Sequence, residues 1–414
     1  MNNIYGCIGE VLKHSFSKEI HNAIADYEYE LYEIPKNELG NYMQQAAFKA
    51  INVTIPYKEL VIPYLYYIDD HAKAIGAVNT VVNRDGKLYG YNTDFYGMSE
   101  LIRHIGIEVE GKKVAILGSG GTAKTAHAVS IALGADDVLT VSRRKSESTI
   151  SYDELYDEHA DTQIIINTTP VGMYPRIDES PIDLSKLPNV IGVVDAVYNP
   201  LRTKLIQDAK DRGIPAEGGL YMLVAQAVRA SEIFQDVSYA EELVEKTYRD
   251  IIREKENIVL IGMPACGKST VGALLSDITS RKFVDTDSIV VKNEGCEIRE
   301  IFANHGEPYF RKLESAAVAE CSSLTASIIA TGGGVVLNEN NIRLLKRNGK
   351  VFFIDRPLEL LIPTSDRPLT SDRESLKRKY EERYPLYSAL ADVHINGSMD
   401  ATAVASFIKG EMLK

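Results

Sequence analysis

Residues 257–270 read NIVLIGMPACGKST, an apolar run that leads through a glycine-containing turn into Lys268-Ser269-Thr270. A strand, a glycine turn and a helix in this order match the whole phosphate-binding P-loop pattern. In that pattern backbone N–H groups surround phosphates, the lysine reaches the terminal oxygens, and the following hydroxyl binds Mg²⁺. The stretch therefore predicts an ATP-binding α/β domain with a parallel sheet. The residues predicted to bind the nucleotide are Gly262, Gly267, Lys268, Ser269 and Thr270, and Ser269 is also expected to coordinate Mg²⁺.

A second transition from strand to glycines lies upstream, where residues 112–121 read KKVAILGSGG. A tight turn of this kind lets the backbone approach a pyrophosphate at the amino terminus of a helix, where N–H groups and the helix dipole favour anions. The same pattern also fits a strand-to-helix turn without a ligand, so it does not decide between the two. The glycines that would contact a dinucleotide are Gly118, Gly120 and Gly121.

The strand predicted next ends in Ser142-Arg143-Arg144-Lys145. At this position a site for NAD usually carries an acidic residue for the ribose hydroxyls, whereas guanidinium groups suit the 2′-phosphate of NADP. A solvated basic loop is the alternative interpretation, and only the glycine turn upstream separates the two. We therefore expect NADP(H), held in part by Ser142, Arg143 and Arg144.

Apolar segments with strand character alternate with helical patterns, which predicts α/β units with parallel sheets. Before residue 100 these segments are IYGCIGE, NVTIP, NTVVN and KLYGYN, and ADDVLTVSRRK and DTQIIINTTP follow the upstream glycine turn. Between residues 238 and 256 apolar residues fall at helical spacing among many charges, which predicts one amphipathic helix. The P-loop stretch begins directly after it, so a domain boundary is expected near residues 250–257.

Length, charge and cysteine use limit the function classes. The 414 residues are too many for one ordinary hydrophobic core, so two or three domains are expected. A formal net charge of -12 argues against nucleic acid and acidic membranes as partners. No signal-like amino terminus and no apolar run of membrane-spanning length is seen, so a cytoplasmic location is expected. The four cysteines lack metal-ligand spacing and are expected to be free thiols.

The part of the chain before residue 235 contains an ordered set of short motifs. They are HSFS at 14–17, NVTIPYK at 52–58, GAVNT at 76–80, YNTD at 91–94, NTTP at 167–170, DAVY at 195–198 and GGLYMLVAQA at 218–227. In this order they closely resemble the signatures of shikimate dehydrogenases, and the resemblance covers nearly all of residues 4–235.

The resemblance implies NADPH-dependent reduction of 3-dehydroshikimate to shikimate, which needs a hydride on carbon and a proton on the developing alkoxide. It implies that Lys58 and Asp94 manage that proton, although either residue alone would usually be a surface charge. It also implies a cofactor contact at Gly219. The substrate would be held at its carboxylate by Ser15 and Ser17, with Tyr198 nearby, and at its ring oxygens by Thr54, Asn79, Asp94 and Gln226.

A second ordered set follows the P-loop. It consists of DTD at 285–287, GEPYFR at 306–311, GGG at 332–334, RPL at 367–369 and RYPLY at 383–387. Together with the P-loop these motifs resemble those of shikimate kinases, from about residue 257 to the end of the chain. The resemblance implies a nucleoside monophosphate kinase-like fold and the transfer of phosphate from ATP to shikimate in the presence of Mg²⁺.

The residue types in this set suit an acidic polyol. Arg311 and Arg383 would form fork-like contacts with its carboxylate, with Glu314 fixing the first arginine, although an arginine taken alone is more often part of a surface salt bridge. A positively charged residue in a loop that closes over the site, the lid, would neutralise charge on the phosphoryl group during its transfer. The remaining implied residues are Asp287 for the attacking hydroxyl, Asp285 for Mg²⁺, the backbone of Gly333 and Gly334 for shikimate, and Arg367 in the lid.

Three places depart from the family patterns. Lys18 stands where the dehydrogenases usually have proline, and Thr122-Ala123-Lys124 is atypical after the glycines. Leu360-Leu361-Ile362 replaces an arginine that often precedes the kinase lid, which itself looks short. The last departure concerns nucleotide affinity and lid closure rather than the reaction class.

The two resemblances share one metabolite, so the leading hypothesis is a bifunctional enzyme that makes shikimate and then shikimate 3-phosphate. Two alternatives are a quinate/shikimate dehydrogenase that uses NAD, fused to the kinase, and a non-catalytic ligand sensor. Arg143 and Arg144 favour NADP, and the sensor is disfavoured because Lys58, Lys268 and Asp287 are all present. Whether the chain is a monomer or a homodimer stays open.

The expected domains are a substrate-binding domain at 1–100 with a returning helix at about 220–250, a Rossmann domain at 101–235, a helical linker at 236–256 and the P-loop domain at 257–414.

Overall fold

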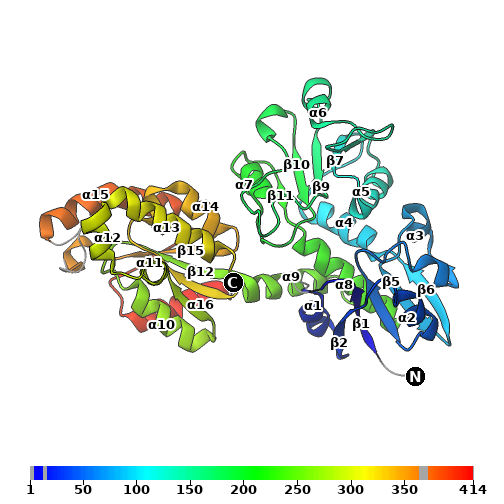
Figure 1. Cartoon of the computed structure of the whole chain (residues 1–414), viewed down its shortest axis with the longest axis horizontal. Helices are drawn as coiled ribbons and strands as arrows, with labels where there is room; N and C mark the ends of the chain where they lie inside the picture. Colours follow the sequence, from blue (N-terminus) through cyan, green and yellow to red (C-terminus); the bar gives the residue numbers. More distant parts are fainter. Residues whose placement is uncertain (1–3, 13–15, 363–371, 414) are drawn as a thin grey trace. The chain divides into compact units, whose positions relative to one another are not determined.

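The computed structural model describes residues 4–12, 16–362 and 372–413. The chain divides into two compact units, Met1–Ile251 and Ile252–Lys414, and each is described by itself (Figure 1). The first unit contains two sheets and the second contains one. The expected α/β class is confirmed, because helices pack on all three sheets.

The first sheet is mixed, with the strand order β2-β1-β3-β5-β6-β4. Its strands are β1 (Tyr5–Gly9), β2 (Tyr29–Glu33), β3 (Ala50–Val53), β4 (Tyr67–Ile68), β5 (Thr80–Arg84) and β6 (Lys87–Tyr91). β1 is parallel to both neighbours, whereas β5 is antiparallel to β3 and β6. Asp85 and Gly86, both with positive φ, form the tight turn from β5 to β6. This sheet is therefore only partly parallel, because the hairpin of β5 and β6 takes the place of one helical connection.

The second sheet is fully parallel, with the order β11-β10-β9-β7-β8. Its strands are β7 (Lys113–Leu117), β8 (Asp137–Val141), β9 (Ile164–Asn167), β10 (Gly192–Asp195) and β11 (Ala216–Glu217). The central strands are apolar runs that are buried throughout, as expected for a parallel sheet covered by helices on both faces. The helices of this part are α5 (Gly121–Ala132), α6 (Tyr152–Glu158) and α7 (Lys204–Lys210).

Two long helices join the sheets of the first unit. α4 (Thr93–His104) leads from the first sheet to the second, and α8 (Leu220–Gln235) returns and packs on α1 and β5. The two helices lie against each other at Gly97, where an added Cβ atom would be 2.6 Å from the carbonyl oxygen of Met222. The smaller helices here are α1 (Ser17–Ile24), α2 (Leu39–Gln45), α3 (Asp70–Ile75) and the 3-10 turns η1 (Ile62–Tyr64) and η2 (Leu184–Lys186).

The amphipathic helix expected after residue 238 is α9 (Glu242–Lys255), which spans the boundary between the units. Its apolar side is buried, and the ring of Tyr248 lies 5.1 Å from that of Tyr221 in an edge-on contact. His104 stacks on Tyr221 with ring centroids 3.9 Å apart. The first turns of α9 therefore belong to the core of the first unit.

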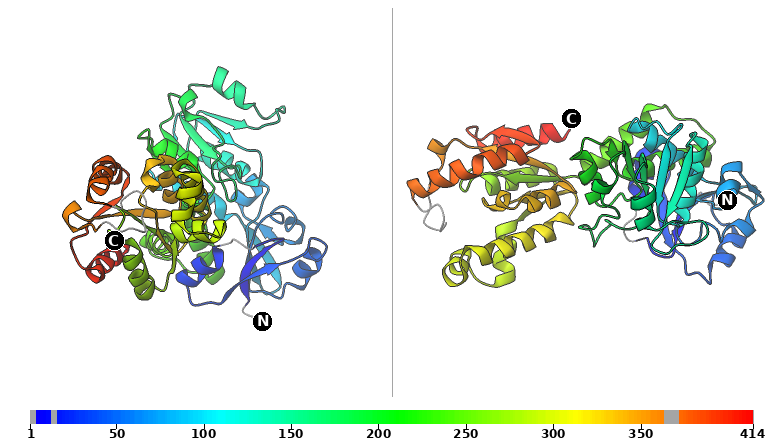
Figure 2. Two further views of the ribbon diagram at one scale, coloured as in Figure 1. Left: turned by 60° about the vertical axis from the view of Figure 1, so that its left-hand side comes forward. Right: turned by 90° about the horizontal axis from the view of Figure 1, so that it is seen from above.

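The second unit is built on a parallel sheet with the order β13-β14-β12-β15-β16. Within this unit α10 and α16 cover one face, and α13, α14 and α15 lie on the other (Figures 1 and 2). Its strands are β12 (Asn257–Ile261), β13 (Lys282–Asp285), β14 (Ser327–Ala330), β15 (Gly349–Asp355) and β16 (Val393–Asn396). Its helices are α10 (Lys268–Thr279), α11 (Thr286–Glu294), α12 (Ile298–His305), α13 (Glu307–Ser322), α14 (Glu339–Lys346), α15 (Arg373–Leu390) and α16 (Ala401–Met412), with the 3-10 turns η3 (Val335–Leu337) and η4 (Leu358–Leu360).

Among the described residues, every helix is too short or too polar to span a membrane. All four cysteines are free.

Candidate active sites

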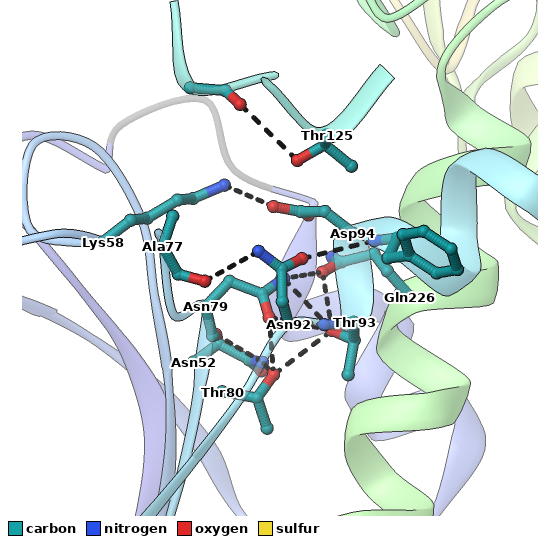
Figure 3. A network of polar contacts seen from close by, with 12 residues as sticks. Asn52, Lys58, Ala77, Asn79, Thr80, Asn92, Thr93, Asp94, Thr125 and Gln226 are labelled. Atoms are coloured by element: carbon teal, nitrogen blue, oxygen red, sulfur yellow. Dashed lines mark hydrogen bonds and ion pairs between the residues drawn. The ribbon is translucent and has the colours of Figure 1, made fainter. Parts of the chain in front are cut away.

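An ion pair joins Lys58 and Asp94 in the first unit, with Nζ and Oδ2 2.6 Å apart (Figure 3). Lys58 follows β3, and Asp94 lies in the first turn of α4, so two residues 36 positions apart in the sequence meet here. Their side chains are 22% and 14% exposed, which leaves both groups accessible to a ligand. A lysine and a carboxylate in such contact can hold a proton between them and pass it to an oxygen that arrives beside them.

Beside this pair a hydrogen-bonded network connects Asn79 and Gln226 (Figure 3). The Nδ2 atom of Asn79, which directly precedes β5, donates to Oε1 of Gln226 on α8 over 3.2 Å. The backbone N–H of Thr93 donates to Oδ1 of Asn79 over 2.7 Å. The sequence motif YNTD contains Thr93, but the motif assigned it no role. Only the folded geometry shows that it holds Asn79.

The other predicted substrate ligands of the first unit are partly described. Thr54 follows β3 directly, and its backbone N–H donates to the carbonyl of Ile8. The ring of Tyr198 lies 5.4 Å from that of Phe16, which precedes Ser17 at the start of α1. Burial raises the pKa of Tyr198, so its phenol stays protonated and remains a donor. Ser15 lies outside the described residues.

The glycine turn of the first unit has the conformation that the sequence predicted. Gly118 has a φ of 108°, and an added Cβ atom would lie 2.8 Å from Oγ1 of Thr168. No atom stands within 4 Å of a Cβ atom added at Gly120 or Gly121, where α5 begins. The open side of the turn is therefore free for a phosphate at the helix amino terminus. Gly219 differs, because its added Cβ atom would collide with the carbonyl of Ala196, which gives this glycine a packing reason of its own.

A cavity of about 680 Å³ lies between the glycine turn and the loop after β8. Lys145 does not line this cavity, because it forms an ion pair with Glu154. This contact lowers the pKa of the Glu154 carboxyl group to about 2. Among the described carboxylates none pairs with Arg143 or Arg144. Two uncompensated guanidinium groups among hydroxyls suit a phosphate monoester. The lining residues are Ser119, Ser142, Arg143, Arg144, Ser146, Ser148 and Thr149.

In the second unit one cavity of about 640 Å³ extends from the P-loop to Arg383. Gly262 is not among its lining residues. It has a φ of 148° and packs against Ile354. Arg367 lies outside the described residues. The structure brings the other predicted kinase residues together, since the lining includes Gly267, Lys268, Ser269, Thr270, Asp285, Asp287, Arg311, Gly333, Gly334 and Arg383.

The P-loop end of this cavity is arranged for a nucleotide phosphate. Nζ of Lys268 donates to the carbonyl oxygens of Gly262 and Met263 over 2.9 and 3.0 Å, so the ammonium group lies inside the loop. Oγ of Ser269 donates to Oδ2 of Asp285 over 2.9 Å, which places two magnesium-type oxygen ligands side by side. Among the described residues no group of three or more His, Cys, Asp and Glu side chains could hold a metal ion. The oxygens present fit a Mg²⁺ that takes most of its ligands from phosphate and water.

The far end of the cavity contains two arginines in different environments. Arg311 is held by Glu314, with Nη1 and Oε2 2.8 Å apart, and by Glu307, with Nη2 and Oε1 also 2.8 Å apart. Arg383 is 2% exposed and uses only Nη1, which donates to the carbonyl of Gly333 over 2.8 Å. Its Nε and Nη2 atoms are buried without a hydrogen-bond partner among the described residues. A buried cation with two free donors is unfavourable until an anion meets it.

Glu314 also has an unused group at this end. Its Oε1 atom is buried without a hydrogen-bond partner in the described part of the chain. Burial raises the pKa of Glu314, and the nearby Arg311 guanidinium opposes that rise. Glu307 received no role from the sequence, although it lies in the quoted motif GEPYFR, because a motif does not indicate which of its members contact each other.

Comparison with known proteins matches two families on this chain. Residues 7–81 match the shikimate dehydrogenase substrate binding domain, and residues 264–411 match shikimate kinase. A shikimate dehydrogenase (NADP(+)) of Clostridium beijerinckii is 38% identical over 259 residues, which cover 59% of this chain and 96% of that protein. The corresponding protein of Geobacillus kaustophilus is 35% identical and is covered completely.

Solved structures of shikimate dehydrogenases match about three fifths of the chain. A chorismate mutase/shikimate 5-dehydrogenase fusion protein from Clostridium acetobutylicum has a TM-score of 0.57 and 36% identity, with 61% of this chain and 98% of that chain covered. Shikimate dehydrogenase 1 from Peptoclostridium difficile has a TM-score of 0.55 and 35% identity, with 60% and 98% covered. The chain therefore belongs to the shikimate dehydrogenase family and carries, after that part, a shikimate kinase domain.

Proposed function

We propose that this chain catalyses two consecutive reactions. The first unit reduces 3-dehydroshikimate to shikimate with NADPH, and the second transfers the terminal phosphate of ATP to shikimate. The observation that carries the proposal is the presence, on one chain, of two family matches whose substrates meet at shikimate. In this proposal the substrates are small molecules, and neither a nucleic acid nor a membrane takes part in either reaction.

For the first reaction we assign the proton to Lys58 and Asp94. Reduction leaves negative charge on the former ketone oxygen, and a lysine Nζ that lies 2.6 Å from a carboxylate can deliver a proton to that oxygen. The hydride comes from the nicotinamide of NADPH when that cofactor is bound. Thr54, Asn79 and Gln226 would orient the ring oxygens. Ser15, Ser17 and Tyr198 would bind the carboxylate of the substrate.

For the cofactor we propose that Arg143 and Arg144 bind the 2′-phosphate of NADP. Both guanidinium groups line the cavity next to the glycine turn, whereas Lys145 is occupied by Glu154. Gly118, Gly120, Gly121 and Gly219 would contact the rest of the dinucleotide, and Ser142 would contribute a hydroxyl.

For the second reaction we assign the shikimate carboxylate to Arg311 and Arg383. The free Nε and Nη2 donors of Arg383 form the kind of fork that a carboxylate accepts, and Arg311 is already oriented by two glutamates. Asp287 would accept the proton of the attacking hydroxyl or orient it, because it lines the same cavity as the two arginines and the P-loop. Lys268 and the lid residue Arg367 would stabilise charge on the phosphoryl group, and Ser269 with Asp285 would hold Mg²⁺.

The experiment for the first reaction compares substrates and cofactors. Purified protein is assayed with shikimate or quinate and with NADP⁺ or NAD⁺, by following the absorbance of the reduced cofactor. We expect turnover with shikimate and NADP⁺ and much weaker turnover in the other combinations. Preferred use of quinate with NAD⁺ would support the alternative enzyme class instead, and turnover in none of the four would favour the non-catalytic sensor for this unit.

The experiment for the second reaction follows ADP release from ATP and Mg²⁺ with shikimate, and with 3-dehydroshikimate as the comparison. We expect ADP release to depend on shikimate and to be lost in Lys268→Ala. As a matched control, Lys282→Ala removes an exposed lysine of the same unit that lies outside the lining of the cavity. Shikimate-independent ATP hydrolysis at the full rate would contradict the assignment.

We also propose the domain limits given by the motifs, with a substrate-binding domain at 1–100, a Rossmann domain at 101–235 and a kinase domain at 257–414. The intervening segment 236–256 contains α9, which is more than a linker in this proposal because its apolar side is buried.

A further inference from the structure

The hydrogen bonds around Asn79 determine how two amide side chains are oriented (Figure 3). The backbone N–H of Thr93 points at one end of the Asn79 amide, 2.7 Å away. A backbone N–H can only donate, so this end must be the oxygen, Oδ1. The opposite end is then Nδ2, which donates to Oγ1 of Thr93 over 3.1 Å and to Gln226 over 3.2 Å.

The orientation passes from Asn79 to Gln226. Because Nδ2 of Asn79 only donates, Gln226 must turn its oxygen, Oε1, toward it. The hydroxyl of Thr93 lies 3.4 Å from the same oxygen and 3.2 Å from Oδ1 of Asn79, so its one proton can be donated to either amide oxygen. Nε2 of Gln226 has no hydrogen-bond partner among the described residues, and the side chain is partly exposed. This NH₂ group is the end that a ligand meets.

Thr93 itself is out of reach of a ligand. It is the first residue of α4 and 1% exposed, and its hydroxyl also lies 3.2 Å from that of Thr80. An effect of this hydroxyl on the substrate must therefore pass through its neighbours, and the two amides are those that face the substrate in the proposed function.

We propose that Thr93 is a positioning residue that makes Gln226 a hydrogen-bond donor toward the substrate. The proposal rests on the proposed dehydrogenase function, in which Gln226 contacts a ring oxygen. It specifies the chemistry of that contact, since the substrate group must offer an acceptor such as a hydroxyl or carbonyl oxygen. An ammonium substituent at this contact would face the NH₂ group of Gln226, which offers it no acceptor, and would therefore be disfavoured.

The test begins with Thr93→Val, which keeps the shape of the side chain and the backbone N–H but removes the hydroxyl that touches both amides. We expect the KM for shikimate to rise about tenfold, as for the loss of one or two hydrogen bonds. The KM for NADP⁺ should be unchanged and kcat should change much less than KM. Thr93→Ser restores the hydroxyl and should return the KM for shikimate to within about twofold of the wild-type value.

A double-mutant cycle separates positioning from general damage. In a Gln226→Ala background the hydroxyl contacts only the Asn79 amide, so Thr93→Val should raise the KM for shikimate by clearly less than it does in the wild-type background. Ser99→Ala is the matched control, because it removes another buried hydroxyl of α4, one that donates to the carbonyl of Phe95 in its own helix. It should leave the KM for shikimate unchanged.

The proposal is overturned if Thr93→Val has its full effect in the Gln226→Ala background, or if Thr93→Ser behaves like Thr93→Val. If Thr93→Val does not fold, Thr93→Ala carries the same comparison. Wild-type turnover is measured first and tests the proposed function alone. Calorimetric titration of shikimate into the same variants yields affinities without turnover, so the positioning role is tested even if the wild-type chain does not oxidise shikimate.

Discussion

Arg383 shows how one residue is suited to binding at a cost in stability. Its guanidinium is buried, yet only one of its nitrogen atoms has a hydrogen-bond partner among the described residues. Buried cations of this kind often destabilise a fold relative to an apolar residue of similar size. The free donors would be satisfied when a carboxylate binds.

We therefore predict opposite effects of Arg383→Met on binding and on stability. The KM for shikimate in the kinase reaction should rise roughly 10- to 100-fold, because charge-assisted hydrogen bonds are lost. The thermal midpoint of unfolding should stay the same or rise. Arg378→Met, an exposed arginine on the same helix α15, is the control and should change neither quantity. A lower midpoint together with an unchanged KM would show that Arg383 is a structural residue.

Asp195 yields a prediction about pH. It is 0% exposed and accepts hydrogen bonds from Asn167, Val197 and Thr203, but burial still raises its pKa from 3.8 to about 6. A raised pKa means that the folded state binds this proton more tightly than the unfolded state. The resulting stabilisation is complete below the unfolded pKa and is lost as the pH rises through about 6.

The measurement is the free energy of unfolding of the wild type relative to Asp195→Asn, whose side chain does not titrate. This difference should fall by on the order of 1 to 3 kcal/mol between about pH 4 and pH 7. A difference that is constant, or that increases with pH, would mean that Asp195 is ionised at no cost in its buried place.

At the residue scale the sequence was informative wherever a chemical group belongs to a recognised motif. Lys58 and Asp94 were predicted to act together and are in contact, and Lys268, Ser269 and Asp285 line one cavity, while their roles stay predictions. Thr93 and Glu307 were not assigned a role, because they act by contacting another side chain, and such contacts depend on residues distant in sequence.

At the scale of the elements, the loop after β14 holds the glycine triplet 332–334 close against other side chains. A Cβ atom added at Gly334 would lie 1.9 Å from Nη1 of Arg311, whereas one added at Gly410 on α16 would meet nothing within 4 Å. The backbone of Gly334 has a φ of -106°, which alanine adopts without strain. Any effect of an added methyl group at this position therefore comes from the collision with Arg311.

Gly334→Ala should displace Arg311 from the cavity and raise the KM for shikimate in the kinase reaction by about tenfold or more. Gly410→Ala is its matched control and should leave the KM unchanged while stabilising α16 by up to about 1 kcal/mol. Kinetic assays of the two variants measure the KM for shikimate, and thermal unfolding measures their stability. Equal KM values for the two would mean that Arg311 does not bind the substrate.

The loop after β8 is the element that should decide the cofactor. Arg143→Asp combined with Arg144→Ala removes both uncompensated guanidinium groups, so the KM for NADPH should rise roughly 100-fold or more. The KM for NADH, which lacks the 2′-phosphate, should change little. Lys145→Ala is the control, because this lysine is held by Glu154. Equal losses with both cofactors would show that the loop does not contact that phosphate.

Elements were predictable where the pattern of apolar residues is local. The buried runs of β7, β9 and β12 and the amphipathic face of α9 were confirmed. The mixed first sheet was not foreseen, because strand direction depends on the turn at Asp85 and Gly86 and on which strands pair. Neither property is contained in the periodicity of a single segment.

In the whole molecule, the two sites are built from separate stretches of the chain. The residues proposed for hydride transfer lie in the first unit, and those proposed for phosphoryl transfer lie in the second. Each unit has its own sheets and buried core. The two reactions should therefore be separable by mutation, with each variant losing one step only.

The most direct test is a product balance on the intact chain supplied with 3-dehydroshikimate, NADPH, ATP and Mg²⁺. We predict that the wild type forms equal amounts of NADP⁺, ADP and shikimate 3-phosphate at completion. Lys58→Ala should form none of these at an appreciable rate, and Lys268→Ala should accumulate shikimate. A mixture of the two variants should again form shikimate 3-phosphate. Consumption of NADPH without ADP formation in the wild type, or a mixture that remains inactive, would contradict the account of two independent and consecutive sites.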